Sequence, residues 1–271
     1  MKRTNRIHTF ITILIGVIWL IPVVYLVNVA LKPASELYSV GVFSFVREPT
    51  LGNFVEAWSK VKNYLLNSLI YVVFSVPLGI FLASLAAFGV SRMKGAWRSA
   101  AVGFFTVGML IPVHITLLPN YITMMHLGLL DTHVGLVILY TVFNIPFAFY
   151  LMYGAMMNVS REIEDAAKID GASVWRTFWS VVLPICKPSI IIAALLNFIA
   201  VWNELIFANT FIQSNTKMPI TTGLLQFVGE FSTAYEKITA GILMSAVPIL
   251  IVFLLFRKNI MTGMTEGAVK G

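Results

Sequence analysis

Long uncharged stretches alternate with short clusters of charge along the chain. Five stretches lack Asp, Glu, Lys and Arg and a sixth contains only Glu204; they cover residues 7–31, 63–91, 99–130, 132–160, 188–216 and 238–256. Each can supply the roughly 20 apolar residues that cross a hydrocarbon core of about 30 Å. The pattern predicts a single all-α integral membrane domain over 1–271 with six transmembrane helices, at 9–31, 64–90, 100–123, 133–157, 188–210 and 238–256.

A soluble helical bundle is the alternative, because periodicity alone does not separate a buried helix from a spanning one. Composition argues against it: 58% of residues are hydrophobic and 11% are charged, whereas charged residues make up about a quarter of a soluble domain. The first apolar run follows Lys2, Arg3 and Arg6 like a secretory signal, but it exceeds the usual length of about 7–15 residues and lacks a small-residue cleavage site. We interpret it as an uncleaved first helix.

The distribution of charge predicts the orientation. With the N-terminus inside, thirteen of the nineteen basic residues fall on the cytoplasmic side: Lys2, Arg3, Arg6, Arg92, Lys94, Arg98, Arg161, Lys168, Arg176, Lys187, Arg257, Lys258 and Lys270. Five acidic residues accompany them and leave +8 inside, the outer loops cancel to zero, and Glu204 accounts for the total of +7. The positive-inside rule then places both termini in the cytoplasm. The net charge therefore indicates topology and not a nucleic-acid partner.

Cofactor and metal motifs are missing from the sequence. Cys186 is the single cysteine, which excludes an intrachain disulfide, and the four histidines lack zinc-ligand spacing. No Gly-x-x-x-x-Gly-Lys-Ser/Thr segment is present to hold ATP phosphates. We expect no metal site, no cofactor bound by this chain and no catalytic residues.

Small residues and prolines mark the predicted helices. Ser75, Gly79, Ala83 and Ala87 recur at four-residue steps and would let another helix approach closely. Prolines occur within the spanning runs and should bend them, at Pro22, Pro77, Pro112, Pro119, Pro146 and Pro248. Bent, closely packed helices suit a transporter or a channel.

The cytoplasmic loop 158–187 is the most charged segment. Ser160 can cap a first short helix, Gly171 can end it in a left-handed conformation, and Ser173 can cap a second helix that runs toward Pro184. The first helix would expose small alanines beside acidic residues, and the second would anchor on the bundle through Val174, Phe178 and Val181. This predicts a helix-turn-helix docking element; the alternative is an amphipathic pair at the membrane interface without a partner.

The run from Glu164 to Pro188 resembles the EAA loop of ATP-binding-cassette importer permeases. The matching positions are Asp165, Ala166, Ala167, Asp170, Gly171, Ala172, Leu183, Pro184 and Pro188. Asp165 stands where that family usually has Glu, so the carboxylate sits on a shorter arm. Further similarity points to the carbohydrate branch of the family, the maltose-type or multiple-sugar importers: Asn67-Ser68, Ile111-Pro112, Trp202-Asn203-Glu204 and the tail Gly263 to Gly271.

The resemblance implies a function and a set of partners. It implies a sugar importer subunit in a bacterial or archaeal plasma membrane, beside a second homologous permease, two copies of an ATPase that hydrolyse ATP, and an extracytoplasmic sugar-binding protein. The loop would couple ATP hydrolysis to transport through Glu164, Asp165, Ala166, Ala167, Asp170, Gly171 and Ala172.

Glu204 is the single Asp, Glu, Lys or Arg residue inside a predicted span, where a carboxylate is costly. It lies on the same small and polar face of the fifth predicted helix as Asn197. Together with Asn144 and Asn203, these residues could pair with sugar hydroxyls in a substrate pathway. Alternatively, Asn203 and Glu204 bond to the outer loop and hold a gate. Other classes also stay open: a channel or proton-coupled carrier that uses Glu204, or an importer of a solute other than sugar.

Overall fold

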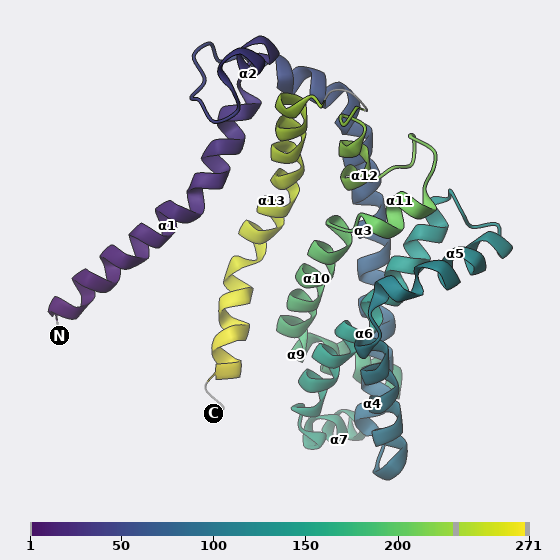
Figure 1. Cartoon of the computed structure of the whole chain (residues 1–271). Helices are drawn as coiled ribbons and strands as arrows, with labels where there is room; N and C mark the ends of the chain where they lie inside the picture. The colour runs from purple at the N-terminus through teal and green to yellow at the C-terminus, as the bar shows by residue number, and fades with distance from the viewer. Residues whose placement is uncertain (1, 230–232, 269–271) are drawn as a thin grey trace. The chain divides into compact units, whose positions relative to one another are not determined.

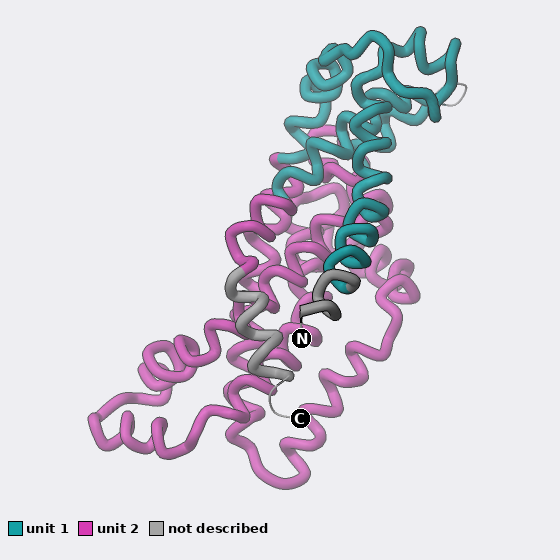
Figure 2. The backbone as a smooth tube through the Cα atoms, turned by 90° about the vertical axis from the view of Figure 1, so that its left-hand side faces the viewer, with its two compact units in different colours: residues 1–65, 222–248 teal, residues 66–221, 249–271 magenta. Residues whose placement is uncertain are grey.

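The computed structural model describes the backbone of residues 2–229 and 233–268 and the side chains of 8–229 and 233–257. The terminal bases Lys2, Arg3, Arg6, Lys258 and Lys270 therefore lie outside the described side chains, as does the tail at 263–271. The chain forms two compact units, residues 1–65 with 222–248 and residues 66–221 with 249–271 (Figure 2).

Helices dominate both units, as the sequence predicts. Four helices are long and apolar enough to span a membrane, over His8–Ala30, Gly52–Arg92, His133–Met157 and Tyr235–Arg257. Two further candidates are bent pairs of helices, Gly95–Leu110 with Val113–His126 and Val174–Ile185 with Lys187–Trp202. The count reaches the expected six if each bent pair crosses once.

The first unit contains α1 (Lys2–Ala30), α2 (Ala34–Val40), the start of α3 (Gly52–Arg92), most of α12 (Ile220–Leu225) and the first part of α13 (Tyr235–Ala268). The loop after α2 folds around the fully buried Lys32, whose Nζ donates to the carbonyl oxygens of Gly41 at 3.0 Å and Val42 at 3.2 Å. Asn28 at the end of α1 accepts from Val46 N at 2.8 Å. These bonds satisfy buried polar groups that would otherwise destabilise the loop.

The second unit contains the candidate sites. Its elements after α3 are α4 (Gly95–Leu110), η1 (Val113–Thr116), α5 (Leu117–His126), α6 (His133–Met157), α7 (Arg161–Ile169), α8 (Val174–Thr177), η2 (Phe178–Val182), α9 (Leu183–Ile185), α10 (Lys187–Trp202) and α11 (Ile206–Phe211) (Figure 1). Helix α6 packs against both α4 and α10. A buried core that includes Phe149, Met152, Ala193 and Phe198 stabilises this arrangement by burying apolar area.

The small-residue stripe on α3 provides a close helix contact. Ser75, Ala83 and Ala87 are fully buried. At Gly79, an added Cβ would lie 3.2 Å from Cβ of Asn144 and 3.3 Å from the carbonyl oxygen of Thr141 on α6. The predicted close approach is therefore present, and α6 is the partner helix.

Two of the predicted spans are interrupted. The span expected at 100–123 ends as α4 at Leu110 and turns by 86° into η1 and α5. Pro112 explains the break because it lacks an N–H donor and disfavours a helical Ile111, whose ψ is 116°. The span expected at 188–210 ends as α10 at Trp202, so Glu204 lies in a break between α10 and α11 and not within a helix. Local bonds from Asn203 and Glu204 compete with helix continuation there.

Candidate functional site

Short-range capping builds α7 and the turn that follows it. Ser160 Oγ accepts from Glu162 N at 3.2 Å, and Ser173 Oγ accepts from Arg176 N at 3.3 Å. Gly171 has a φ of 80°, and both Gly171 N to Lys168 O and Ala172 N to Ala167 O measure 2.9 Å. This pair of bonds is a Schellman cap. The predicted helix-turn-helix is present with the predicted caps.

Helix α7 has one face turned outward and one turned inward. Asp165, Ala166 and Asp170 are exposed, and Ile169 is 87% exposed. Asp165 accepts from Lys168 Nζ at 2.7 Å, and this bond lowers the pKa of the Asp165 carboxyl. Ala167 and Ala172 are half-buried and Gly171 is exposed.

Glu164, one of the predicted coupling residues, is turned into the second unit and not toward the outward face of α7. It is 4% exposed and forms an ion pair with Arg92 at the end of α3. The second helix of the loop was predicted to anchor on the bundle through its apolar residues. Phe178 is buried as predicted, but Val174 is exposed and does not anchor on the bundle. The helix-turn-helix also includes the π-helical turn η2, where an extra residue is accommodated.

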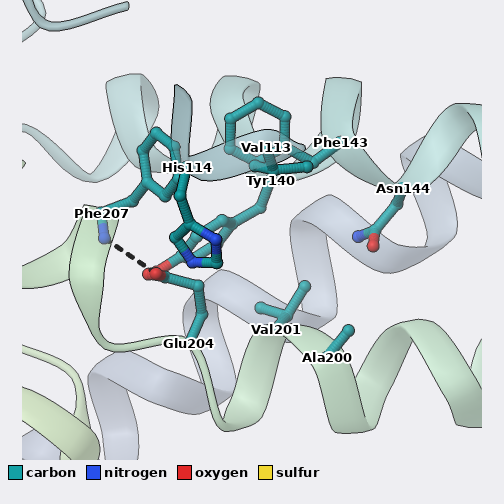
Figure 3. Close-up of a pocket in the computed structure, with 9 residues that line it drawn as sticks. All are labelled: Val113, His114, Tyr140, Phe143, Asn144, Ala200, Val201, Glu204 and Phe207. Carbon is teal, nitrogen blue, oxygen red and sulfur yellow. Dashed lines mark hydrogen bonds between the residues drawn. The ribbon is translucent and has the colours of Figure 1, made fainter. Parts of the chain in front are cut away.

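A cavity of about 210 Å³ lies between α6, α10, η1 and α11 (Figure 3). Its walls are mostly apolar and include four polar side chains, and the complete lining is Val113, His114, Tyr140, Phe143, Asn144, Ala200, Val201, Glu204 and Phe207. Asn144 and Glu204, both predicted as pathway or gate residues, therefore line one cavity.

Glu204 holds the break between α10 and α11. Its carboxylate accepts from Tyr140 Oη at 2.7 Å, Phe207 N at 2.8 Å and Ala208 N at 2.9 Å. Its backbone carbonyl accepts from Thr221 Oγ1 at 2.7 Å. Two of these donors, Phe207 N and Ala208 N, lie in the first turn of α11, so the side chain caps that short helix.

The three asparagines have different surroundings. Asn144 is 6% exposed and Asn197 is 2% exposed, and the Nδ2 atom of each finds no hydrogen-bond acceptor among the described residues. Asn197 lies outside the cavity lining. Asn203 is exposed and donates from Nδ2 to Ile199 O at 2.9 Å, a bond within its own helix end. Asn144 is thus the one asparagine of the three that lines this cavity.

Hydrogen bonds and an ion pair join the loop at 212–221 to two other parts of the second unit. Asn67 Nδ2 on α3 donates to the carbonyls of Thr216 and Met218, both at 2.9 Å. Asp131, with a φ of 53°, accepts from Ser214 N at 2.9 Å and pairs with Lys217 at 3.2 Å. Burial raises the pKa of Asp131, but the hydrogen bonds, led by Ser214, outweigh it and hold that pKa well below its usual range.

Sequence reasoning missed two features here. Tyr140, one helical turn before Asn144, could have been found from that spacing. The pairing of Asn67 with residues 149 and 151 positions away has no local signal.

Within residues 8–229 and 233–257, no group of three or more His, Cys, Asp or Glu side chains could hold a metal ion.

The comparisons with known proteins agree with this architecture. Residues 75–259 match the family model of the binding-protein-dependent transport system inner membrane component. A protein of Caldicellulosiruptor sp. (strain Rt8B.4), described as an ABC transporter permease protein, is 33% identical over 93% of this chain and 92% of its own length. The chain belongs to this family of transport permeases.

Two further comparisons concern sugar importers. A melibiose/raffinose/stachyose import permease protein of Bacillus subtilis (strain 168) is 28% identical over 99% of this chain and 98% of its own length. The crystal structure of a bacterial ABC transporter involved in the import of the acidic polysaccharide alginate matches with a TM-score of 0.80 at 23% identity, covering 95% of this chain and 98% of that one. The second likeness shows a shared fold.

Proposed function

We propose that this chain is the membrane-spanning subunit of an ATP-driven importer that moves a sugar or oligosaccharide delivered by an extracytoplasmic binding protein. The observation that carries the proposal is α7, a capped amphipathic helix with an exposed outward face, in a chain of the binding-protein-dependent permease family. Two ATPase subunits and a second homologous permease would complete the importer. The ATPase subunits would hydrolyse ATP, and this chain would have no catalytic role.

The outward face of α7 is suited to a protein partner. Ile169 projects beside the Gly171 turn, and Val174 and Trp175 are also exposed just after it. Ala166 leaves room for a partner surface close to the helix backbone, and Asp165 and Asp170 can pair with cationic side chains around the contact. An apolar centre with a charged rim is the usual anatomy of a protein interface.

The cavity supplies a place for this subunit to meet its substrate. Asn144 would donate from its unpaired Nδ2 to a sugar hydroxyl, because a buried donor without a partner gains most from a ligand that satisfies it. Glu204 would act as the gate residue that fixes the α10–α11 break, with Asn203 at the helix end beside it. Asn197, which has a similarly unpaired amide, would face a later stage of the pathway or the second permease.

The binding pattern of Glu204 argues against a proton-coupled carrier. A proton-carrying carboxylate must exchange its proton during transport, whereas Glu204 accepts two backbone hydrogen bonds that need an anionic or carbonyl oxygen. The hydrogen bonds from Phe207 N, Ala208 N and Tyr140 Oη therefore support a structural role for the Glu204 carboxylate at this break.

Site-directed cross-linking tests the docking helix. Cys186 is 2% exposed and is the single cysteine, so Ile169→Cys adds one accessible thiol to the chain. In membranes that contain the co-expressed importer subunits, a maleimide-benzophenone probe on Ile169→Cys should cross-link to the ATPase. Trp97→Cys is the matched control, since Trp97 is also well exposed but belongs to α4. Equal ATPase cross-linking from both positions, or none from Ile169→Cys, would reject α7 as the docking helix.

A further inference from the structure

An ion pair joins the docking helix to the longest helix of the fold. Arg92 is the last residue of α3, and Glu164 lies in the first turn of α7, 72 positions later. Arg92 Nε donates to Glu164 Oε2 at 3.2 Å, and Arg92 Nη2 donates to Glu164 Oε1. Both carboxylate oxygens are therefore engaged by one guanidinium group, the bidentate arrangement with the strongest directional preference.

Further contacts fix the same corner of the structure. Arg161 Nη2 on α7 donates to the backbone carbonyl of Ser91 at 2.9 Å. The Arg92 guanidinium lies over the Phe88 ring at 4.4 Å, and Phe88 packs against Phe178 at a ring distance of 5.1 Å. Both halves of the helix-turn-helix thus contact the final turn of α3.

Burial of this pair needs an explanation beyond stability. The Glu164 side chain is 5% exposed and that of Arg92 is 17%, whereas each of the other ion pairs in the described structure has both side chains at least 31% exposed. Burying two charges costs desolvation energy, and well-packed apolar residues often serve as well. What an ion pair adds is geometric: it specifies how one element sits against another.

Helix α3 leads directly from this pair to the cavity. Gly79 lies thirteen residues before Arg92, about 20 Å along the helix at 1.5 Å per residue. Gly79 contacts α6 at Asn144 itself, where a Cβ would lie 3.2 Å from the Asn144 Cβ. Any rotation or shift of α3 imposed at Arg92 would therefore reach a cavity-lining side chain through closely packed atoms, which have little room to yield.

We propose that Arg92 and Glu164 are positioning residues that transmit the movement of α7 to α3, and through Gly79 to Asn144, during the transport cycle. The proposal rests on the proposed function, because it assigns a role within ATP-driven import. It predicts that a broken pair leaves the ATPase docked and active but no longer linked to substrate movement.

The test uses the complete importer in proteoliposomes loaded with ATP, with maltose, melibiose and raffinose as radiolabelled probes and the binding protein present. Glu164→Gln and Arg92→Gln each break the pair, and the double variant Arg92→Glu with Glu164→Arg restores it with reversed charges. Glu162→Gln is the matched control, since Glu162 is an exposed carboxylate on the same helix turn. Sugar uptake, ATP hydrolysis and cross-linking from Ile169→Cys are measured for each variant.

We expect each single variant to lower the ratio of sugar taken up to ATP hydrolysed by about tenfold, within the range of mutations along a coupling route. Cross-linking to the ATPase should stay at the wild-type level, and the charge-reversed double variant should regain most of the ratio. A wild-type ratio in both single variants would overturn the proposal, as would loss of ATPase cross-linking together with uptake, which would make the pair merely structural. Absence of ATP-dependent uptake in the wild-type importer would instead reject the proposed function.

Discussion

Replacing Glu204 by glutamine changes one acceptor oxygen into a donor at the break between α10 and α11. In the native structure Oε2 accepts from Tyr140 Oη and Ala208 N, and Oε1 accepts from Phe207 N. Glutamine keeps a single acceptor oxygen, which can serve the Tyr140 and Ala208 donors. Its amide NH₂ then faces the Phe207 N–H, so two donors oppose each other and one backbone group loses its partner.

The expected loss of folding stability in Glu204→Gln follows from these contacts. A hydrogen bond to a charged group contributes about 1.5–3 kcal/mol, and the two retained bonds also lose their charge assistance. The lower desolvation cost of a neutral side chain offsets part of this loss. We therefore expect Glu204→Gln to destabilise the folded protein by about 2 kcal/mol. Tyr140→Phe removes one donor and leaves both backbone bonds, so its effect should be about half as large.

Thermal unfolding of the detergent-solubilised protein, followed by intrinsic fluorescence, measures this difference. Asn203→Ala is the control, because Asn203 is exposed and bonds within its own helix end; its effect should stay within about 0.5 kcal/mol. The reasoning fails if Glu204→Gln unfolds at the same temperature as Asn203→Ala and the wild type. In that case Glu204 would not hold the break.

Three further predictions concern other contacts of the second unit. Because the folded-state pKa of Asp131 is lowered, its hydrogen bonds contribute their full stability above the unfolded pKa of about 3.9, and this contribution is lost as pH falls toward the folded pKa. The free energy of unfolding should therefore decrease between pH 6 and pH 3 in the wild type, and Asp131→Asn should lack this decrease. Gly171→Val should cost about 1–2 kcal/mol at a φ of 80° and reduce ATP-dependent sugar uptake, whereas Gly89→Ala, at an open position, should leave uptake unchanged. Gly79→Val should separate α3 from Asn144 and destabilise the protein by about 1–3 kcal/mol in the same unfolding assay, and an effect no larger than that of Gly89→Ala would contradict the close contact.

Local signals predicted local structure well. The span predicted at 133–157 is α6 at His133–Met157, and Ser160, Gly171 and Ser173 cap the helix-turn-helix as their residue types indicate. Each of these features depends on atoms within a few positions along the chain. That short range is why a single sequence is sufficient to place them.

The misplacements have a common physical origin in contacts between distant segments. Glu164 is one of the predicted coupling residues, but it is buried because it pairs with an arginine 72 positions earlier. Glu204 was placed within a helix, but its side chain finds Tyr140 and the N–H groups of α11 and ends that helix. Pro112 indicated a bend but not its size, which is 86° in the structure. The orientation with both termini in the cytoplasm stays a prediction.

The most direct test of the central claim is the energy source of sugar uptake. Importer assembled from this chain, the proposed second permease and the proposed ATPase is reconstituted in proteoliposomes, with the loaded binding protein outside and either ATP or a non-hydrolysable ATP analogue inside. We predict uptake with ATP and with binding protein, none with the analogue, and no response to an imposed proton gradient. Uptake driven by the proton gradient without ATP would contradict the account and identify the chain as a secondary carrier.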